Sequence, residues 1–176
     1  MRTWSLFIAV VFPAVFVTPA IAQESEFELA TYSPERRWNR SAQLLIAVQM
    51  ADIMEKKAEG KTAEQIGRMS FEAYGPPQGW TGSDTPWKLF RGMYYNWMSN
   101  PEQRCELLEA SDAEVVARCN RPWAGFIDER GPAYGVSVGE YETVGLVFCQ
   151  GIAEYHGLEW IQERNGNDFR ITVRKK

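Results

Sequence analysis

Three cysteines and a single histidine are the residues of this chain that are best suited to chemistry. Cys105 and Cys119 lie at equal distances from Asp112, so a hairpin that turns there would place the two thiols opposite each other on neighbouring strands. Cys119 and Cys149 form the rival pair, and three packed, unpaired thiols are a third interpretation. Either pairing leaves one free thiol, which is notable in a protein that is exported.

Catalysis is the second role open to these residues. Cys149 would act as the nucleophile, with Cys119 or His156 assisting it. His156 follows Cys149 by seven residues, on the same face of a predicted helix but about 10 Å further along it. That separation is too long for a direct hydrogen bond, so the two residues could line one pocket without forming a nucleophile–base pair. A histidine near a helix C-terminus also has a simpler use, because positive charge stabilises that end.

Other signatures of chemistry are missing from the sequence. It contains no Cys-x-x-Cys or His-x-x-x-His spacing, no Gly-x-Ser-x-Gly, no phosphate loop and no dinucleotide-binding motif. We therefore predict neither a metal nor another cofactor. Glu140 and Glu142 lie in the first turns of a predicted helix, where acidic side chains stabilise the helix dipole.

Aromatic side chains are the candidate ligand contacts. Trp87, Tyr94 and Trp97 belong to the third predicted helix, and Trp123 follows the second predicted strand. Such residues could wall an apolar pocket between helices and sheet. The simpler alternative is that they fill the core.

Capping signals and apolar periodicity predict the elements that would position these residues. Helices are expected over 35–59, 62–74 and 139–155, and a further helix is expected to open at Thr85-Pro86 and to be closed by Asn100-Pro101. Hairpins are expected from strands 104–109 and 114–119, and from strands 158–163 and 168–173 around an Asn-Gly turn. Residues 120–138, rich in glycine and proline, are expected to form a loop. The order predicts an α+β fold, in which N-terminal helices and one crossover helix pack on a four-stranded antiparallel sheet made of two hairpins.

The N-terminus predicts a compartment. Arg2, an apolar run to Val17 and Ala20-Ile21-Ala22 form the pattern of a signal peptide over 1–22, with an uncleaved anchor as the alternative. Residues 23–33 would be a flexible lead-in and 34–176 a single domain. We expect a periplasmic or secreted protein, free of the membrane after cleavage. Removal of the predicted signal peptide takes away one basic residue, Arg2, and no acidic residue. The remaining chain has 18 basic and 23 acidic residues, and this net charge of −5 gives no support to nucleic-acid binding.

Two segments and a hairpin carry a family resemblance. Residues 107–123, Phe148-Cys149-Gln150 and the final hairpin with Phe169-Arg170-Ile171 resemble, in this order, the L-2-amino-thiazoline-4-carboxylic acid hydrolase-like family and the related four-vinyl-reductase-type ligand domains. The resemblance covers 40–174. It implies that Cys119 and Cys149 match recurrent cysteines beside a pocket between sheet and helix. It also implies a small-molecule site and hydrolysis of a C–N or C–S bond.

Three functions follow as hypotheses. The preferred one is an exported small-molecule-binding domain, whose pocket between helices and sheet takes a small, partly apolar ligand. The second is a Cys-dependent hydrolase that uses Cys149. The third is a structural or partner-binding envelope protein without catalysis. The sequence does not specify an oligomeric state.

Overall fold

The computed structural model describes residues 32–76 and 78–176. The predicted signal peptide and residues 23–31 of the lead-in lie outside the described residues. Within the described part, the chain forms five helices and four strands: α1 (Pro34–Ala58), α2 (Ala63–Tyr74), α3 (Pro86–Trp97), β1 (Cys105–Ala110), β2 (Glu114–Asn120), α4 (Ala124–Tyr134), α5 (Val138–Tyr155), β3 (Leu158–Asn165) and β4 (Asp168–Lys175).

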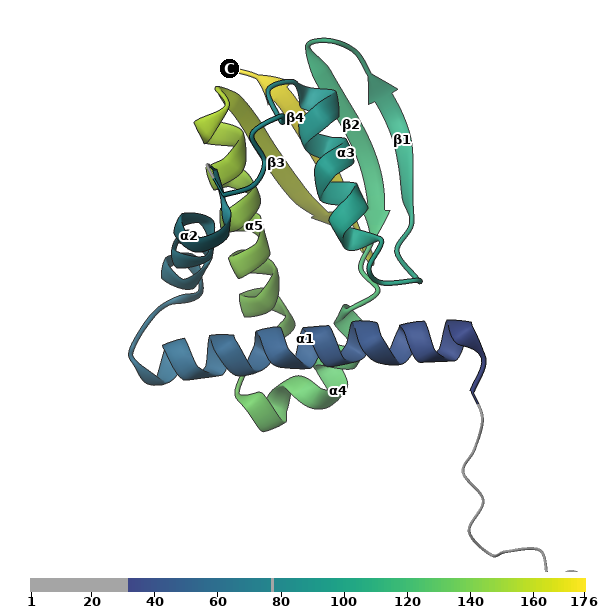
Figure 1. Ribbon diagram of the computed structural model, residues 1–176, viewed down its shortest axis with the longest axis vertical. Coiled ribbons are helices and arrows are strands. Elements are labelled where there is room, and N and C mark those ends of the chain that lie inside the picture. Colours follow the sequence, from purple (N-terminus) through teal and green to yellow (C-terminus); the bar gives the residue numbers. More distant parts are fainter. Residues whose placement is uncertain (1–31, 77) are drawn as a thin grey trace, which may run out of the picture. The chain divides into compact units, whose positions relative to one another are not determined.

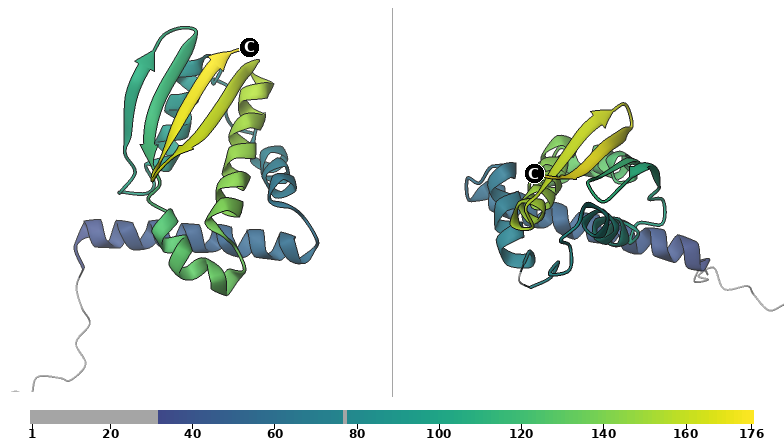
Figure 2. Two further views of the ribbon diagram at one scale, coloured as in Figure 1. Left: turned by 180° about the vertical axis from the view of Figure 1, so that it is seen from behind. Right: turned by 90° about the horizontal axis from the view of Figure 1, so that it is seen from above.

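The four strands form one antiparallel sheet in the order β1-β2-β4-β3, so the two hairpins join through β2 and β4. Helices α3 and α5 lie against one face of this sheet (Figures 1 and 2). Alternate residues of β2 and β4 point into the core beneath these helices, among them Val115, Ala117, Ile171 and Val173. The predicted α+β architecture is therefore confirmed.

Local capping sets where the helices begin. Ser33 accepts a hydrogen bond from the Arg36 amide, and Thr85 accepts one from the Lys88 amide. Helices α2 and α5 each begin with a full capping box. The side chain of the residue before the helix accepts a hydrogen bond from the backbone of the third helical residue, and the side chain of that third residue accepts one from the backbone of the residue before the helix. The helices therefore start close to their predicted positions.

Helix α4 corrects the prediction of a loop over 120–138. The glycines and the proline of this segment suggested an irregular chain. Gly131 instead allows the backbone of Val136 to approach the helix closely, because a Cβ at Gly131 would lie 2.2 Å from the carbonyl oxygen of Val136. Gly135 ends the helix in the left-handed conformation, with φ 62°. Ile127 is buried with Met50 of α1 in a second apolar cluster. This burial stabilises a helix that local propensity alone disfavours.

A disulfide joins Cys105 to Cys119, with 4.1 Å between their Cα atoms. The two residues are register partners at the start of β1 and the end of β2, as their symmetric positions about the turn indicated. Cys149 is the free cysteine, and it is buried. A disulfide fits an oxidising environment. None of the helices in the described part combines the length and the apolar character needed to cross a bilayer.

Candidate functional site

The antiparallel order of the sheet gathers polar residues at one of its ends. β1 and β4 start there, and β2 and β3 end there, because neighbouring strands run in opposite directions. Cys105, Cys119, Phe169 and Arg164 form the last row of partners that includes all four strands. The residues just beyond this row therefore meet in space although they are far apart in sequence.

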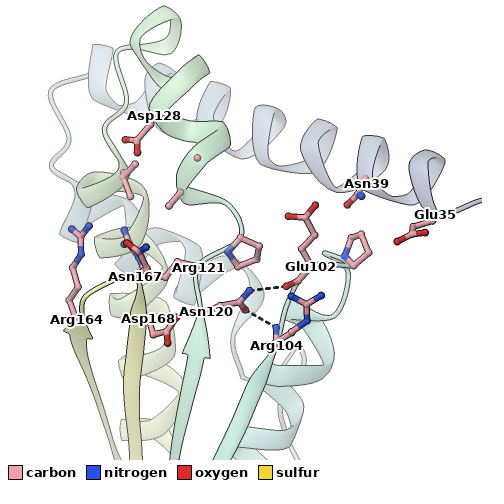
Figure 3. A pocket seen from close by; sticks show the side chains of 15 residues that line it. Glu35, Asn39, Glu102, Arg104, Asn120, Arg121, Asp128, Arg164, Asn167 and Asp168 are labelled. Atoms are coloured by element: carbon pink, nitrogen blue, oxygen red, sulfur yellow. Dashed lines mark hydrogen bonds between the residues drawn. The ribbon is translucent and has the colours of Figure 1, made fainter.

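A cleft of about 750 Å³ opens at this end of the sheet, between the sheet, α1 and the start of α4 (Figure 3). This volume is in the range of small-molecule sites. Its lining is mainly polar. The lining residues are Glu35, Asn39, Pro101, Glu102, Arg104, Asn120, Arg121, Pro122, Ala124, Gly125, Asp128, Val138, Arg164, Asn167 and Asp168.

Charges of both signs line the cleft without pairing with each other. Arg164 lies with Asp168 at one end, and Arg104 lies with Glu102 and Glu35 at the other (Figure 3). Among the described residues, none of these five side chains forms an ion pair. Water solvates these groups in the free protein, and a ligand with complementary charges could replace that water.

Asn120 fixes one wall of the cleft. Its Oδ1 accepts hydrogen bonds from the Arg104 amide at 2.7 Å and from Gln103 Nε2 at 3.1 Å, while its Nδ2 donates to the Glu102 carbonyl at 2.8 Å. The dashed lines in Figure 3 mark two of these bonds. The segment that carries Glu102 and Arg104 is thus held to the end of β2, next to the disulfide. This wall is preorganised for binding.

A buried ion pair forms the floor. The side chain of Arg121 is 3% exposed and that of Glu142, on α5, is 11% exposed. Arg121 Nε donates to Glu142 Oε1 at 2.6 Å, and Trp123 Nε1 donates to the same oxygen at 3.2 Å. Arg121 Nη2 is also in ion-pair contact with this oxygen, although it has no hydrogen-bond partner among the described residues. The guanidinium lies over the ring of Phe169, 5.2 Å from its centroid.

The four predicted aromatic contacts lie elsewhere. Tyr94 and Trp97 pack against the main core, and the Trp97 ring lies 5.9 Å from that of Trp160. Trp123 packs between both apolar clusters. Trp87 borders a smaller, more open recess beside the start of the β1–β2 turn. None of the four lines the polar cleft, and their role as ligand contacts stays a prediction.

The proposed catalytic residues are not brought together as a thiol site. Cys119 is in the disulfide and is therefore not a free thiol. Burial raises the pKa of the Cys149 thiol to about 12, so it is neutral at physiological pH. Its Sγ lies 3.8 Å from Met93 Sδ in the core. His156 Nε2 lies at hydrogen-bond distance, 2.8 Å, from the carbonyl oxygen of Trp80. The backbone of Trp80 is in the left-handed region, with φ 69°.

The sequence alone did not reveal the cleft, because its charged and asparagine side chains have no distinctive spacing and resemble ordinary solvent-exposed residues. The Asn-Gly turn and the cysteine pair locate the end of the sheet, and the polar residues beside them, such as Arg104 and Asp168, were the available signal. In the described ranges, no cluster of three or more histidine, cysteine or acidic side chains is placed to hold a metal ion. No family model, curated protein or solved structure matches the chain.

Proposed function

We propose that this protein is an exported binding protein that holds a small zwitterionic ligand in the polar cleft. The observation that carries the proposal is the set of unpaired charges of both signs around one preorganised recess. The proposal keeps the expected binding role and the position between helices and sheet. It changes the expected ligand from partly apolar to polar, because the lining is polar and the aromatic residues lie elsewhere.

The chemistry of the walls defines the ligand class. Arg164 and Arg104 can each hold a carboxylate in a bidentate pair. Asp168, Glu102 and Glu35 can accept hydrogen bonds from ammonium groups. Short peptides carry both groups on a flexible backbone that the asparagine amides can also bind. A peptide of two to four residues is the ligand that fits this arrangement best.

Export is supported by two independent features. The N-terminal pattern is that of a signal peptide, and the disulfide at the edge of the cleft belongs to oxidising compartments. A peptide-binding protein outside the cytoplasm would meet its ligands among breakdown products of other proteins.

Isothermal titration calorimetry tests the proposal with a panel of peptides: Gly-Gly-Gly, Lys-Glu, Glu-Lys and Ala-Ala-Ala, with glucose as the neutral probe. We expect at least one peptide to bind with a dissociation constant of about 1 mM or tighter and with affinity that falls as salt rises. Glucose is expected not to bind. Absence of binding by all peptides at about 10 mM would refute the proposal.

A matched pair of variants locates the binding. Arg164→Gln removes a cation from the cleft, whereas Arg170→Gln removes an exposed cation from β4 of the same hairpin, outside the residues that line the cleft. We expect the first variant to weaken peptide binding about tenfold, the loss of one charge-assisted contact. The second should leave binding unchanged. Equal effects of both would show that the peptides bind through net charge alone.

The hydrolase hypothesis has its own test. A catalytic thiol must be accessible as a thiolate, whereas Cys149 is buried and its thiol has a raised pKa. We expect iodoacetamide to leave the native protein unmodified at pH 8 and to modify one cysteine after unfolding in urea. Rapid alkylation of the native protein would reopen the hydrolase hypothesis and weaken the choice of the polar cleft as the functional site.

A further inference from the structure

Helix α1 has apolar residues on two opposite faces, and only one of these faces is buried in the described structure. Ala42, Ile46 and Met50 are buried on the side of α2 and α4. Leu44 and Val48 lie on the opposite side, where they are 50% and 66% exposed. Leu44 and Val48 are four residues apart, so they are neighbours on that face and form one small apolar patch.

The exposed face follows a heptad pattern. Its members alternate in spacings of three and four residues, which keeps them on one side of a helix over about 27 Å. From N- to C-terminus they are Arg37, Ser41, Leu44, Val48, Ala51 and Glu55. We call these six residues the α1 stripe. Leu44 and Val48 form its apolar centre, and the small side chains of Ser41 and Ala51 lie on either side of them. The two ends of the stripe carry opposite charges.

The stripe is free in the described part of the chain. In Figure 1 α1 is drawn in front of α4, and in the view from behind in Figure 2 α4 is in front of α1, so α4 covers only one side of the helix. Arg37 and Glu55 are both exposed and neither forms an ion pair with another described residue.

We propose that the α1 stripe binds the same stripe of a second copy of this chain, as an antiparallel helix pair with two-fold symmetry. The symmetry axis would pass at the level of Ile46. Each layer then pairs one residue with the partner's residue that lies equally far from position 46 in the opposite direction along the helix. The layers are Leu44 with the partner's Val48, Ser41 with the partner's Ala51, and Arg37 with the partner's Glu55, each occurring twice.

The order of charges selects this occupant. In the antiparallel register, basic and acidic ends meet at both extremities, whereas a parallel pair would place Arg37 beside the partner's Arg37. A surface that complements itself after a two-fold rotation is the requirement of an isologous dimer. Asn39, which lines the cleft, lies three residues before the buried Ala42, so it is on the same side of the helix as Ala42 and on the side opposite the α1 stripe. The dimer leaves the cleft open, so its test is independent of the proposed function.

Sedimentation velocity on the purified protein, from about 1 to 200 µM, tests the proposal. We expect a reversible monomer–dimer equilibrium. Val48→Asp places two carboxylates in the central apolar layers and should raise the dimer dissociation constant about 100-fold or more. Tyr95→Asp puts the same charge at an exposed apolar position of α3 and serves as the control. It should leave the equilibrium unchanged.

Charge reversal provides a second test that does not depend on the apolar layers. Arg37→Glu and Glu55→Arg each create like-charge contacts at both ends of the pair, and each should weaken the dimer about tenfold. The double variant restores opposite charges and should restore the affinity. Each variant is checked by far-UV circular dichroism, and these exposed positions are expected to leave the fold intact.

Three results would overturn the proposal. A protein that is monomeric at 200 µM excludes the second copy as the occupant. A dimer that Val48→Asp does not weaken uses another surface. A monomer that binds vesicles of anionic phospholipid through the stripe, and loses that binding in Val48→Asp, would identify a membrane surface as the occupant instead.

Discussion

Substitution of Glu142 by alanine removes the carboxylate that neutralises buried Arg121 beneath the cleft. Two donors lose their acceptor at once, Arg121 Nε and Trp123 Nε1, because both bond to Glu142 Oε1. The guanidinium has little access to water that could solvate it instead, since its side chain is 3% exposed. The substitution therefore leaves a buried, uncompensated charge.

The magnitude follows from the two losses. Breaking a buried ion pair by removing one partner costs about 3–5 kcal/mol. An unbonded indole N–H costs about 1–3 kcal/mol. The two costs share one acceptor and overlap, so we expect Glu142→Ala to lower the free energy of unfolding by about 4 kcal/mol. Small domains have about 5–15 kcal/mol in total, so the variant should still fold.

Urea unfolding at pH 7 with the disulfide intact, followed by tryptophan fluorescence and far-UV circular dichroism, measures this loss. Glu106→Ala is the matched control, because Glu106 pairs with Arg118 on the exposed face of the sheet, where their side chains are 59% and 51% exposed. That variant should cost about 0–1 kcal/mol. Arg121→Met/Glu142→Leu removes both buried charges together and should cost about 2 kcal/mol, less than Glu142→Ala alone.

Two outcomes would refute this reasoning. If Glu142→Ala costs no more than Glu106→Ala, water reaches Arg121 and the floor of the cleft is not a dry ion pair. If the double variant is less stable than Glu142→Ala, the arginine stabilises the domain through contacts other than its charge, such as its position over the Phe169 ring.

Four further predictions concern stability. Replacing both disulfide cysteines by serine should cost about 3 kcal/mol in urea unfolding, the loop-closure entropy for a separation of 14 residues. The hydrogen bond from Lys57 lowers the pKa of Glu140 from 4.5 to about 2, so this carboxylate stabilises the fold above pH 4.5 and loses that effect as pH falls towards 2. Glu140→Gln should therefore flatten the loss of stability between pH 4.5 and 2 in acid titrations. Gly151→Ala should cost about 2 kcal/mol by thermal unfolding, because its Cβ would lie 2.7 Å from the Phe71 ring. Gly145→Ala has open space and should gain up to about 1 kcal/mol.

Local signals made most of the elements predictable. The Thr62–Gln65 capping box and the Ser33-Pro34 start mark helices through hydrogen bonds within one turn. The turn that follows Asn165 fixes the register of β3 and β4 in the same local way, because only Gly166 and Asn167 lie between the paired residues Asn165 and Asp168. The symmetric positions of Cys105 and Cys119 about a turn predicted that the two residues face each other, but left Cys119–Cys149 and three free thiols open. Each of these signals acts over a few residues.

Features that depend on distant contacts were not predictable in this way. Helix α4 exists because Ile127 is buried against α1 and Gly131 permits the close approach of Val136, and neither contact is visible in the local sequence. The pairing of β2 with β4 joins the two hairpins across α4 and α5. The polar cleft is the product of this pairing. Aromatic composition suggested a pocket beside Trp97, whose ring lies 5.9 Å from that of Trp160 in the main core.

The disulfide links the compartment of the protein to its proposed site. Strand β1 is an edge strand whose last five residues are exposed, so packing holds it only weakly. The bond from Cys105 to Cys119 fastens its first residue, directly before which Arg104 enters the cleft wall. Asn120, the residue after Cys119, completes that wall by hydrogen bonding. In a reducing environment the wall would depend on those hydrogen bonds alone, so an oxidising compartment keeps the cleft preorganised as well as the fold stable.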